Sequence, residues 1–261
     1  MIIDCHCHFF PDNLAPKVIP ELSAKANINA YTNGTLNNTI ELCDEQGIDK
    51  MILLSIATNP RQMNKVNDFA ISSNHDRVIA FGSVHPDAQN ATDELKRLHE
   101  EGIIGIKLHP EYQEFNPHEE RLYPIYEQCS KLKMIISFHA GHDLGFESYR
   151  ARPQDFATVI NDFPDLKIIL AHMGGFDAWD EVSEHIAGKN IYLDTSFISV
   201  HMKKEEALKI IKKHGTDKII FGTDTPWDTP KQTREFIESL GLSDYELEKI
   251  YYKNAEILLN I

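Results

Sequence analysis

MIISFH at residues 134–139, PQDFATVIND at residues 153–162 and KIILAH at residues 167–172 are the three runs that decide the fold. The first and third runs are short and apolar on both faces, which is typical of parallel strands buried between layers. The middle run mixes polar and apolar residues over a length typical of a helix. Together they predict one strand–helix–strand unit in which each strand ends in a histidine.

The same alternation runs through the whole chain. Eight strand-like runs are expected at Ile2–His8, Met51–Ile56, Val78–Val84, Ile103–Leu108, Met134–His139, Lys167–His172, Ile191–Thr195 and Lys218–Thr223. Helix-like segments lie at Leu36–Gln46, Gln62–Asn74, Thr92–Glu101, Glu119–Leu132, Pro153–Asp162, Ala178–Ile186, Glu205–His214 and Gln232–Leu240. Ser243 and Glu246 form a capping box, which predicts a further C-terminal helix through Leu259.

Eight consecutive βα units favour a single (β/α)8 barrel over residues 1–261. The alternative is a doubly wound open sheet, but its Gly-x-Gly-x-x-Gly fingerprint is missing after the first strand, where Phe9-Phe10-Pro11-Asp12 follows. The stretch Phe10–Asn33 is expected to form a long first βα loop with at most a short helix. Loops of this kind often overhang the site of a barrel.

Composition excludes several classes of function. The 261 residues carry a net charge of −14, with 42% hydrophobic and 25% charged residues, so the chain is neither disordered nor suited to nucleic acid. No apolar run approaches a membrane span, and no signal peptide is visible. The four cysteines are too scattered for a disulfide framework. We therefore expect a cytoplasmic protein that acts on a small molecule, with a homodimer left open.

Polar residues gather at the expected strand ends, where barrel enzymes place their catalytic groups. These residues are His6, His8, Lys107, His109, His139, His172 and Asp224, with His85 as one further candidate. Six other histidines lie in or beside helices and are interpreted as solvent-facing: His75, His99, His118, His185, His201 and His214. The strand-end set is the central observation of the sequence.

Alternation along the first strand predicts that Asp4, His6 and His8 share one face, with Cys5 and Cys7 on the other. This parity makes the cysteines packing residues rather than metal ligands. His6, His8, His139 and Asp224 can then converge on one divalent ion and leave a coordination position open for catalysis. The alternative for the histidines is hydrogen bonding within a core.

Five motifs resemble the amidohydrolase superfamily. They are His-x-His at 6–8, Gly-x-Lys-Leu-His-Pro at 105–110, Phe-His-Ala-Gly at 138–141, Ala-His-Met-Gly-Gly at 171–175 and Phe-Gly-Thr-Asp-Thr-Pro-Trp at 221–227. The most similar branch includes aminocarboxymuconate-semialdehyde decarboxylase. The resemblance implies a distorted TIM barrel with a metal, usually zinc, held by His6, His8, His139 and Asp224. Manganese is the alternative ion, and a second metal bound through Lys107 and His172 stays open.

The first functional hypothesis is a metal-dependent hydrolase of an amide, ester or lactone. Asp224 would act as the base on a metal-activated water, and His172 would polarise the substrate carbonyl. The alternative is a nonoxidative decarboxylase (carboxy-lyase) of a small unsaturated or aromatic acid, which the resemblance also implies. A third class, a barrel that only binds its ligand, fits less well with an intact ligand set.

Five residues are candidates for substrate binding. Arg150 and Arg152 follow His139 in a loop, and a bidentate arginine is the natural partner of a carboxylate. An equally good interpretation makes both of them surface residues. Trp227 is expected to form part of the wall of the site. Lys107 and His109 share one strand face, so both side chains can reach the site.

Overall fold

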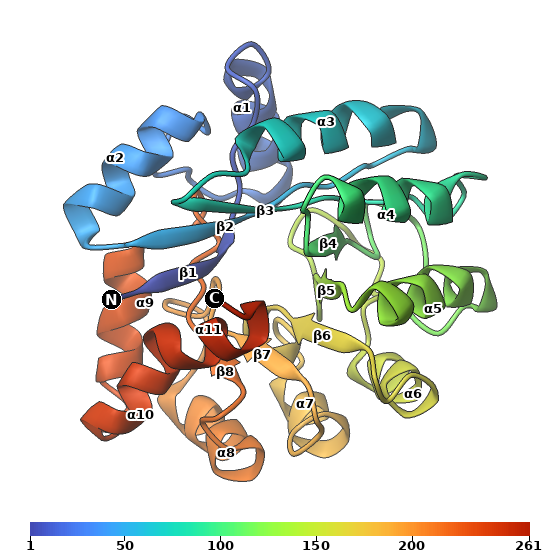
Figure 1. Ribbon diagram of the computed structural model, residues 1–261. Helices are drawn as coiled ribbons and strands as arrows, with labels where there is room; N and C mark the ends of the chain where they lie inside the picture. The colour runs from blue at the N-terminus through green and yellow to red at the C-terminus, as the bar shows by residue number, and fades with distance from the viewer.

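The computed structural model describes residues 1–261 and shows eight parallel strands surrounded by helices (Figure 1). The strands are β1 (Ile3–Cys7), β2 (Lys50–Leu54), β3 (Val78–Phe81), β4 (Gly105–Leu108), β5 (Ile135–Phe138), β6 (Lys167–Leu170), β7 (Tyr192–Asp194) and β8 (Ile219–Ile220). All eight expected strands are present, each shorter than or equal in length to its predicted run. The (β/α)8 architecture is thereby confirmed.

Hydrogen bonds close the strands into a barrel. Pairing is continuous from β1 to β3 and from β4 to β8. The backbone of Gly82 joins the first group to the second, because its N–H donates to Gly105 and its carbonyl accepts from Lys107. At the other seam, the Cys5 N–H donates to the Phe221 carbonyl over 2.8 Å. The barrel has no free strand edge, as a TIM barrel requires.

The helices surround the strands, and all but the last belong to the outer layer. They are α1 (Ala15–Ala26), α2 (Leu36–Gln46), α3 (Met63–Ser73), α4 (Ala91–Glu100), α5 (Tyr123–Leu132), α6 (Pro153–Asp162), α7 (Trp179–His185), α8 (Lys204–His214), α9 (Pro230–Glu238), α10 (Asp244–Glu248) and α11 (Asn254–Leu259). The capping box of Ser243 and Glu246 starts α10 as predicted. None of these helices combines the length and apolarity that crossing a bilayer requires.

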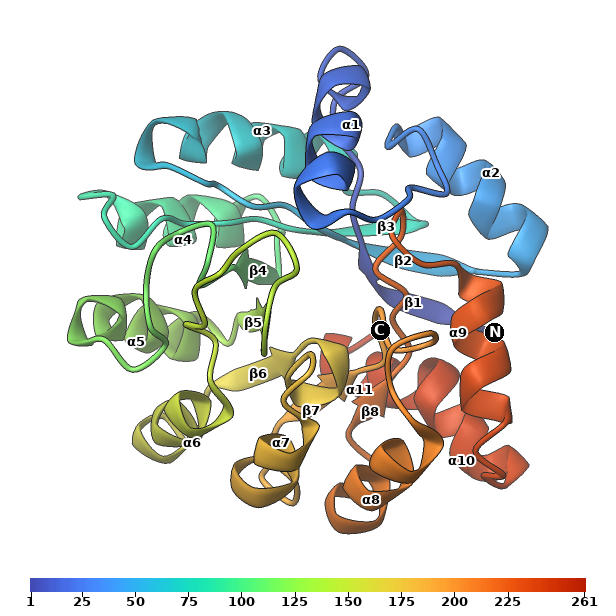
Figure 2. The ribbon, with the colours of Figure 1, turned by 180° about the vertical axis from the view of Figure 1, so that it is seen from behind.

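Helix α1 is the main departure from the expected fold. The first βα loop contains a helix of 12 residues where at most a short one is expected. In both ribbon views this helix lies between α2 and α3 (Figure 2). Its sequence carries Pro16 in the first turn and Pro20 inside, which weakened the helical signal.

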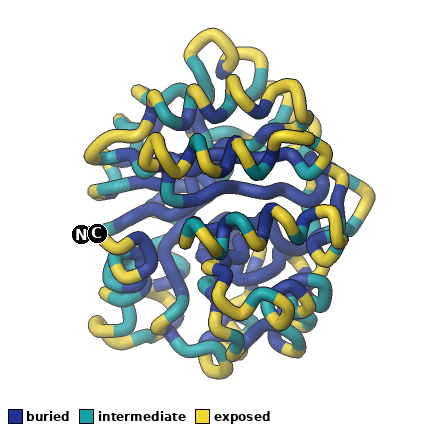
Figure 3. The backbone as a smooth tube through the Cα atoms, turned by 45° about the vertical axis from the view of Figure 1, so that its right-hand side comes forward, coloured by how far each residue is buried: buried dark blue, intermediate teal, exposed yellow.

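The buried residues lie in the interior of the molecule (Figure 3), and the apolar ones form two clusters. The larger cluster fills the space between strands and helices, and the smaller one fills the barrel interior. In the smaller cluster, Ile3 and Cys5 pack with Ala255, Leu258 and Leu259 of α11. The C-terminal helix therefore closes one end of the barrel, and the opposite end is left for the polar strand termini.

Candidate metal centre and substrate cavity

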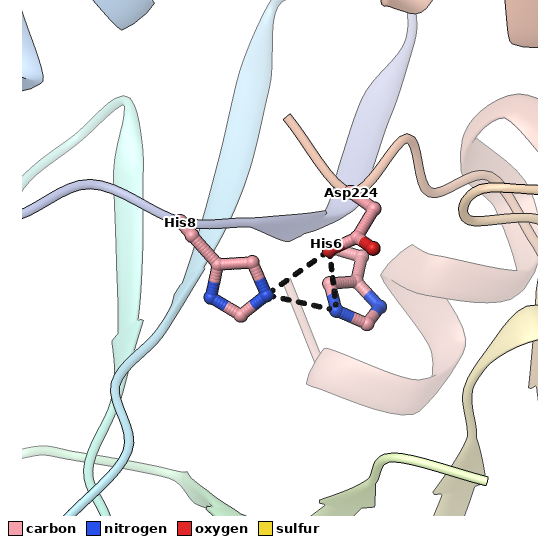
Figure 4. A group of neighbouring side chains, drawn as sticks. All are labelled: His6, His8 and Asp224. Carbon is pink, nitrogen blue, oxygen red and sulfur yellow. Dashed lines mark hydrogen bonds and ion pairs between the residues drawn. The ribbon is translucent and has the colours of Figure 1, made fainter. Parts of the chain in front are cut away.

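His6, His8 and Asp224 meet at the carboxyl ends of β1 and β8 (Figure 4). The Nε2 atoms of the two histidines lie 3.2 Å apart. Asp224 Oδ1 lies 3.3 Å from His6 Nε2 and 3.1 Å from His8 Nε2. Three of the four predicted ligands are therefore in mutual contact.

The hydrogen bonds on the far side of each imidazole ring determine whether its Nε2 atom carries a hydrogen or a lone pair. His6 Nδ1–H donates to Asp194 Oδ2 over 2.8 Å, and His8 Nδ1–H donates to the Leu54 carbonyl over 2.9 Å. Both Nε2 atoms are then lone-pair atoms. They face each other and a carboxylate oxygen, an arrangement of three acceptors that calls for a cation between them.

The dimensions of the group fit a divalent metal. Four donors placed 2.0–2.1 Å from a tetrahedral ion are about 3.3 Å from one another, close to the separations of the three donor atoms here. The rings of His6 and His8 make an angle of 72°, so their lone pairs can converge. Two imidazoles and a carboxylate suit zinc and manganese alike.

A bulge in β1 changes the predicted parity. The pairing register between β1 and β2 shifts between Asp4 and Cys7. Cys5 faces the barrel interior and Cys7 the outer apolar layer, so the expectation that both point away from His6 together is wrong. Asp4 also leaves the site, since it accepts hydrogen bonds from the backbone N–H and hydroxyl of Thr223 at the seam with β8.

The four cysteines are free and buried. Neither Cys5 nor Cys7 belongs to a group that could hold a metal ion. Their role as packing residues is therefore consistent with the structure, although the bulge rather than simple alternation separates them from the site.

His139, the fourth predicted ligand, lies beside this group without touching it. Its Nε2–H donates to the His142 carbonyl over 3.1 Å, which leaves Nδ1 as its lone-pair atom. That Nδ1 lies 3.1 Å from His172 Nε2. Burial, together with His109 and His172, holds the pKa of His139 well below its usual value, so the ring is neutral and available as a ligand.

A second histidine–carboxylate group, His109, His139 and Asp143, is less suited to an ion. The rings of His109 and His139 stack with centroids 4.2 Å apart and planes only 10° from parallel. Lone pairs in parallel planes do not converge on one point. His109 instead lies with Nε2 3.2 Å from Asp143 Oδ2, a contact that ties the loop after β5 to the strand end of β4.

Lys107 brings a positive charge to the floor of the site. Its side chain is buried, and Nζ lies 3.5 Å from His6 Nε2. Burial lowers the pKa of Lys107 to about 8, against the opposing effect of Asp194 and Asp224. The amine is therefore mainly protonated at neutral pH. Burial lowers the pKa of His6 to about 4, and the nearby positive charge of Lys107 adds to this effect.

Asp224 is held as an anion in a constrained backbone. Burial alone would raise its pKa, but His6 and His8 outweigh burial and hold the pKa at about 2. Its φ angle is +70°, and its N–H donates to the His6 carbonyl over 2.8 Å. His172 has a similar φ of +59°. Left-handed conformations at non-glycine residues cluster at functional sites because the surroundings must enforce them.

These residues open into a cavity of about 850 Å³. His6, His8, His139, His172 and Asp224 all line it. The predicted substrate residues Trp227, Lys107 and His109 line it as well. The remaining lining combines apolar side chains from α1, α3 and the strand-end loops with polar ones such as Ser55, Thr58 and Lys65.

The two predicted arginines do not line this cavity. Arg150 lies with Nε 3.6 Å from the buried carboxylate of Glu111, and its backbone N–H also donates to that side chain. Arg152 is exposed, and its guanidinium stacks on the ring of Tyr149 at 4.9 Å. In this arrangement both arginines organise the loop after β5, and Lys107 is the buried cation that faces the cavity.

Two residues important to the site are missing from the sequence-based set. Asp194 is fully buried at the end of β7 and supports His6 from behind. The rule that singled out Asp224, a carboxylate ending an apolar strand, would also have found it. Glu111 accepts hydrogen bonds from the Ser148 hydroxyl and the Arg150 N–H, and no sequence signal marks it.

The sequence profile of the amidohydrolase family matches residues 3–261. The chain belongs to the amidohydrolase family. The resemblance read from the five motifs is thereby confirmed. The barrel with its strand-end metal group is the amidohydrolase fold.

Two curated relatives are decarboxylases. The chain is 25% identical over 191 residues to 2-amino-3-carboxymuconate-6-semialdehyde decarboxylase of Dictyostelium discoideum, a match that covers 60% of this chain and 53% of that enzyme. It is also 25% identical over 285 residues to gamma-resorcylate decarboxylase of Polaromonas sp. strain JS666, covering 85% and 86% of the two chains.

A solved structure supports the fold. A dihydroxybenzoic acid decarboxylase of Polaromonas sp. JS666, with bound manganese and the inhibitor 2-nitroresorcinol, superposes with a TM-score of 0.71 at 19% identity. The superposition covers 99% of this amidohydrolase and 96% of that chain. The TIM-barrel fold is therefore shared over practically the full length described.

Proposed function

We propose that this amidohydrolase is a metal-dependent nonoxidative decarboxylase of small aromatic or unsaturated acids. One observation carries the proposal: the buried Lys107 amine lies beside the His6–His8–Asp224 group at the floor of a cavity, half of whose lining residues are apolar. A carboxylate would meet positive charge there, and an aromatic body would meet apolar side chains.

The relatives favour this chemistry over the hydrolysis expected first. Both curated relatives described above are decarboxylases, and the superposed structure is a decarboxylase of a hydroxylated benzoic acid. Hydrolysis of an amide, ester or lactone uses the same ligand set, so it becomes the outcome against which the proposal is tested.

His6, His8 and Asp224 would hold the ion, with His139 as the fourth ligand through Nδ1, the ring nitrogen that does not donate to the His142 carbonyl. When bound, the metal supplies a Lewis acid that fixes and neutralises the acidic head of the substrate. We propose manganese or zinc, since the donor set suits both and manganese is present in the superposed decarboxylase. One ion is proposed, because His6, His8 and Asp224 form one group of converging donors, whereas the stacked rings of His109 and His139 do not converge on a second ion.

The reaction breaks the bond between the ring carbon and the carboxylate. Its electron pair stays on the ring carbon, which takes up one proton as carbon dioxide leaves. Lys107 would bind a substrate oxygen and prevent a carboxylate from being buried without a counter-charge. Trp227 would pack against the ring as one wall of the cavity.

The proton needs a carrier near the ring carbon. His172 Nδ1–H donates to the Ser196 carbonyl over 3.0 Å, and its Nε2 faces the other histidines across the floor. Asp224 uses Oδ1 for both imidazoles, and Oδ2 has no hydrogen-bond partner within the chain. We propose that a proton taken up from solvent passes to the ring carbon through His172 Nε2 and Asp224 Oδ2.

The test is a substrate panel on protein loaded with manganese or zinc. Hydroxybenzoates and unsaturated acids are compared with amides, esters and lactones, and released carbon dioxide is trapped. We expect carbon dioxide from one or more of the acids, with at least a 100-fold loss of rate in Asp224→Asn. Acid release from the amides, esters or lactones without carbon dioxide from any acid would replace the proposal with hydrolysis.

A further inference from the structure

We propose that the cavity takes an acid whose apolar body is larger than one aromatic ring and packs against α1. The acid part of this inference rests on the proposed function, because it places the carboxylate at the metal group and Lys107. The apolar part rests on the shape and composition of the far half of the cavity.

An apolar stripe faces the cavity from α1. Leu14, Val18, Leu22 and Ala26 follow one another at intervals of four residues, which places them on one side of the helix. All four line the same cavity as the metal group. The neighbouring side of the helix, with Ala15 and Ile19, is buried against the rest of the protein.

This stripe is not part of either apolar layer of the fold. Leu14, Val18, Leu22 and Ala26 neither belong to the two core clusters nor pack against them. Leu14 is 46% exposed. Apolar side chains that line a hollow without packing on a core are a feature of binding sites, because they stabilise the fold little and gain contacts only when a ligand arrives.

The volume is too large for a single ring. A benzene molecule fills a cavity of roughly 150 Å³, whereas this cavity measures about 850 Å³. Val66 and Phe69 of α3 line the space that α1 covers, and α3 lies next to α1 in both ribbon views. An acid bound at the floor would leave this half of the cavity to an alkyl or second aromatic group.

The space at α1 and the metal group belong to one cavity. The occupant of the space at α1 is therefore the apolar body of the same acid that binds at the metal group. A separate ligand or a second copy of the chain would need its own site, whereas here the stripe and the metal group line one hollow. The polar side chains Glu21, Gln62 and Lys65 are exposed members of the same lining. The body of the ligand between the metal group and these polar side chains is therefore apolar.

The test measures binding to the metal-loaded protein rather than turnover. The probes are 2-hydroxybenzoates with a hydrogen, methyl, propyl or hexyl group opposite the carboxylate, and affinities are measured by calorimetry. We expect affinity to rise about fourfold for each methylene that enters the cavity, as transfer of apolar surface from water predicts. The heat-capacity change of binding should become more negative along the series.

Variants of α1 test whether the affinity gained by the longer acids comes from contacts with this helix. Leu22→Trp fills the space and should remove the gain for the propyl and hexyl acids while leaving the unsubstituted acid unchanged. Leu22→Ala should weaken the hexyl acid by about tenfold and spare the unsubstituted one. Ala24→Trp, on the exposed side of the same helix, is the matched control and should alter neither. Thermal unfolding checks that all three variants are folded.

The outcomes separate this inference from the proposed function. Equal affinity along the series, or equal effects of the Leu22 variants on short and long acids, would overturn it even if carbon dioxide is released. Affinity that rises with chain length without any carbon dioxide would keep the apolar site and overturn the decarboxylase proposal. A dimer that dissociates in Leu22→Trp would assign the stripe to a second copy and overturn the inference.

Discussion

His6 Nδ1 lies 2.8 Å from Asp194 Oδ2, and both side chains are fully buried. Burial by itself would raise the pKa of Asp194, but His6, His172 and the Ser196 hydroxyl hold it well below its usual value. The carboxylate also accepts the backbone N–H of His172 over 3.0 Å through Oδ1. One side chain of β7 thus fixes the tautomer of His6 on β1 and the backbone of His172 after β6.

Replacing this carboxylate should weaken the metal site without removing a ligand. We expect Asp194→Asn to lower metal affinity by about 10- to 100-fold, the usual effect of losing the hydrogen-bond partner of a ligating histidine. Metal content after dialysis against buffered metal measures the effect. Asp180→Asn, at a solvent-exposed ion pair with Lys209, is the control. Unchanged affinity in Asp194→Asn would mean that His6 is not a ligand through Nε2.

The bulge in β1 predicts opposite results for adjacent residues. His6→Ala should reduce metal content to well below one ion per chain, because it removes one of three donors already in contact. Cys5→Ala should keep the metal and lower stability by about 1–2 kcal/mol, because it leaves a small gap in the barrel interior. Elemental analysis and thermal unfolding measure the two effects. Loss of metal from Cys5→Ala would contradict the assignment.

Lys107 and Arg152 make a matched pair of cations. Lys107→Met keeps the length and apolar stem of the side chain but removes the charge at the cavity floor. We expect it to weaken binding of a hydroxybenzoate by at least about tenfold, since a charge-assisted hydrogen bond is lost. Arg152→Met, outside the cavity, should change binding less than twofold. The reverse order would transfer carboxylate recognition to the loop after β5.

Gly141 is required where the loops after β5 and β6 approach each other. Its φ is +87°, and a Cβ atom there would lie 2.0 Å from the backbone nitrogen of Phe176. Gly141→Ala should cost at least ~3 kcal/mol of unfolding free energy, from overpacking and from the left-handed backbone. Gly102 also has a positive φ, but a Cβ atom added there would meet no atom within 4 Å. The Tm of Gly102→Ala should therefore fall much less than that of Gly141→Ala. Similar Tm values for the two variants would contradict this reason.

His214 should make stability depend on pH. The structure corrects its assignment as solvent-facing: Nδ1 accepts from the Gly188 N–H and Nε2–H donates to the Ile191 carbonyl. Burial lowers the pKa of His214 below 6.5, despite the opposing hydrogen bond to Ile191. The unfolded chain therefore takes up a proton first, and stability falls as pH drops below about 6.5.

The measurement is urea unfolding between pH 7.5 and pH 5. The slope due to His214 is at most about 1.4 kcal/mol per pH unit, and it should disappear in His214→Gln. His99→Gln, at an exposed position of α4, should leave the slope unchanged. An unaltered slope in His214→Gln would show that other groups cause the dependence.

The barrel could be predicted because each of its units carries a local signal. Strand and helix positions follow from hydrophobic patterning, and α2 and α6 have the predicted bounds, Leu36–Gln46 and Pro153–Asp162. The metal group could be predicted because strand ends converge in a barrel, so His6, His8 and Asp224 had to lie near one another.

Other features depend on information that one segment does not contain. The bulge in β1 reverses the faces of Asp4 and Cys5, and it is visible only in the pairing register with β2, which the pattern of β1 alone does not contain. The placement of Arg150 depends on Glu111, a buried acceptor from a different loop. The sequence predicts too short a helix at α1, because its two prolines weaken the local helical pattern. Tertiary contacts stabilise the helix despite these prolines.

The seam between Asp4 and Thr223 has a consequence for how the protein matures in the cell. These residues are 219 positions apart, so the ring of strands stays open until nearly the whole chain has left the ribosome. His6 and His8 precede Asp224 in the chain, so both are synthesised before it and lack this partner while the units between them are made. We therefore expect metal capture by this group to follow the synthesis of β8, and chains that end before Asp224 should fail to retain the ion.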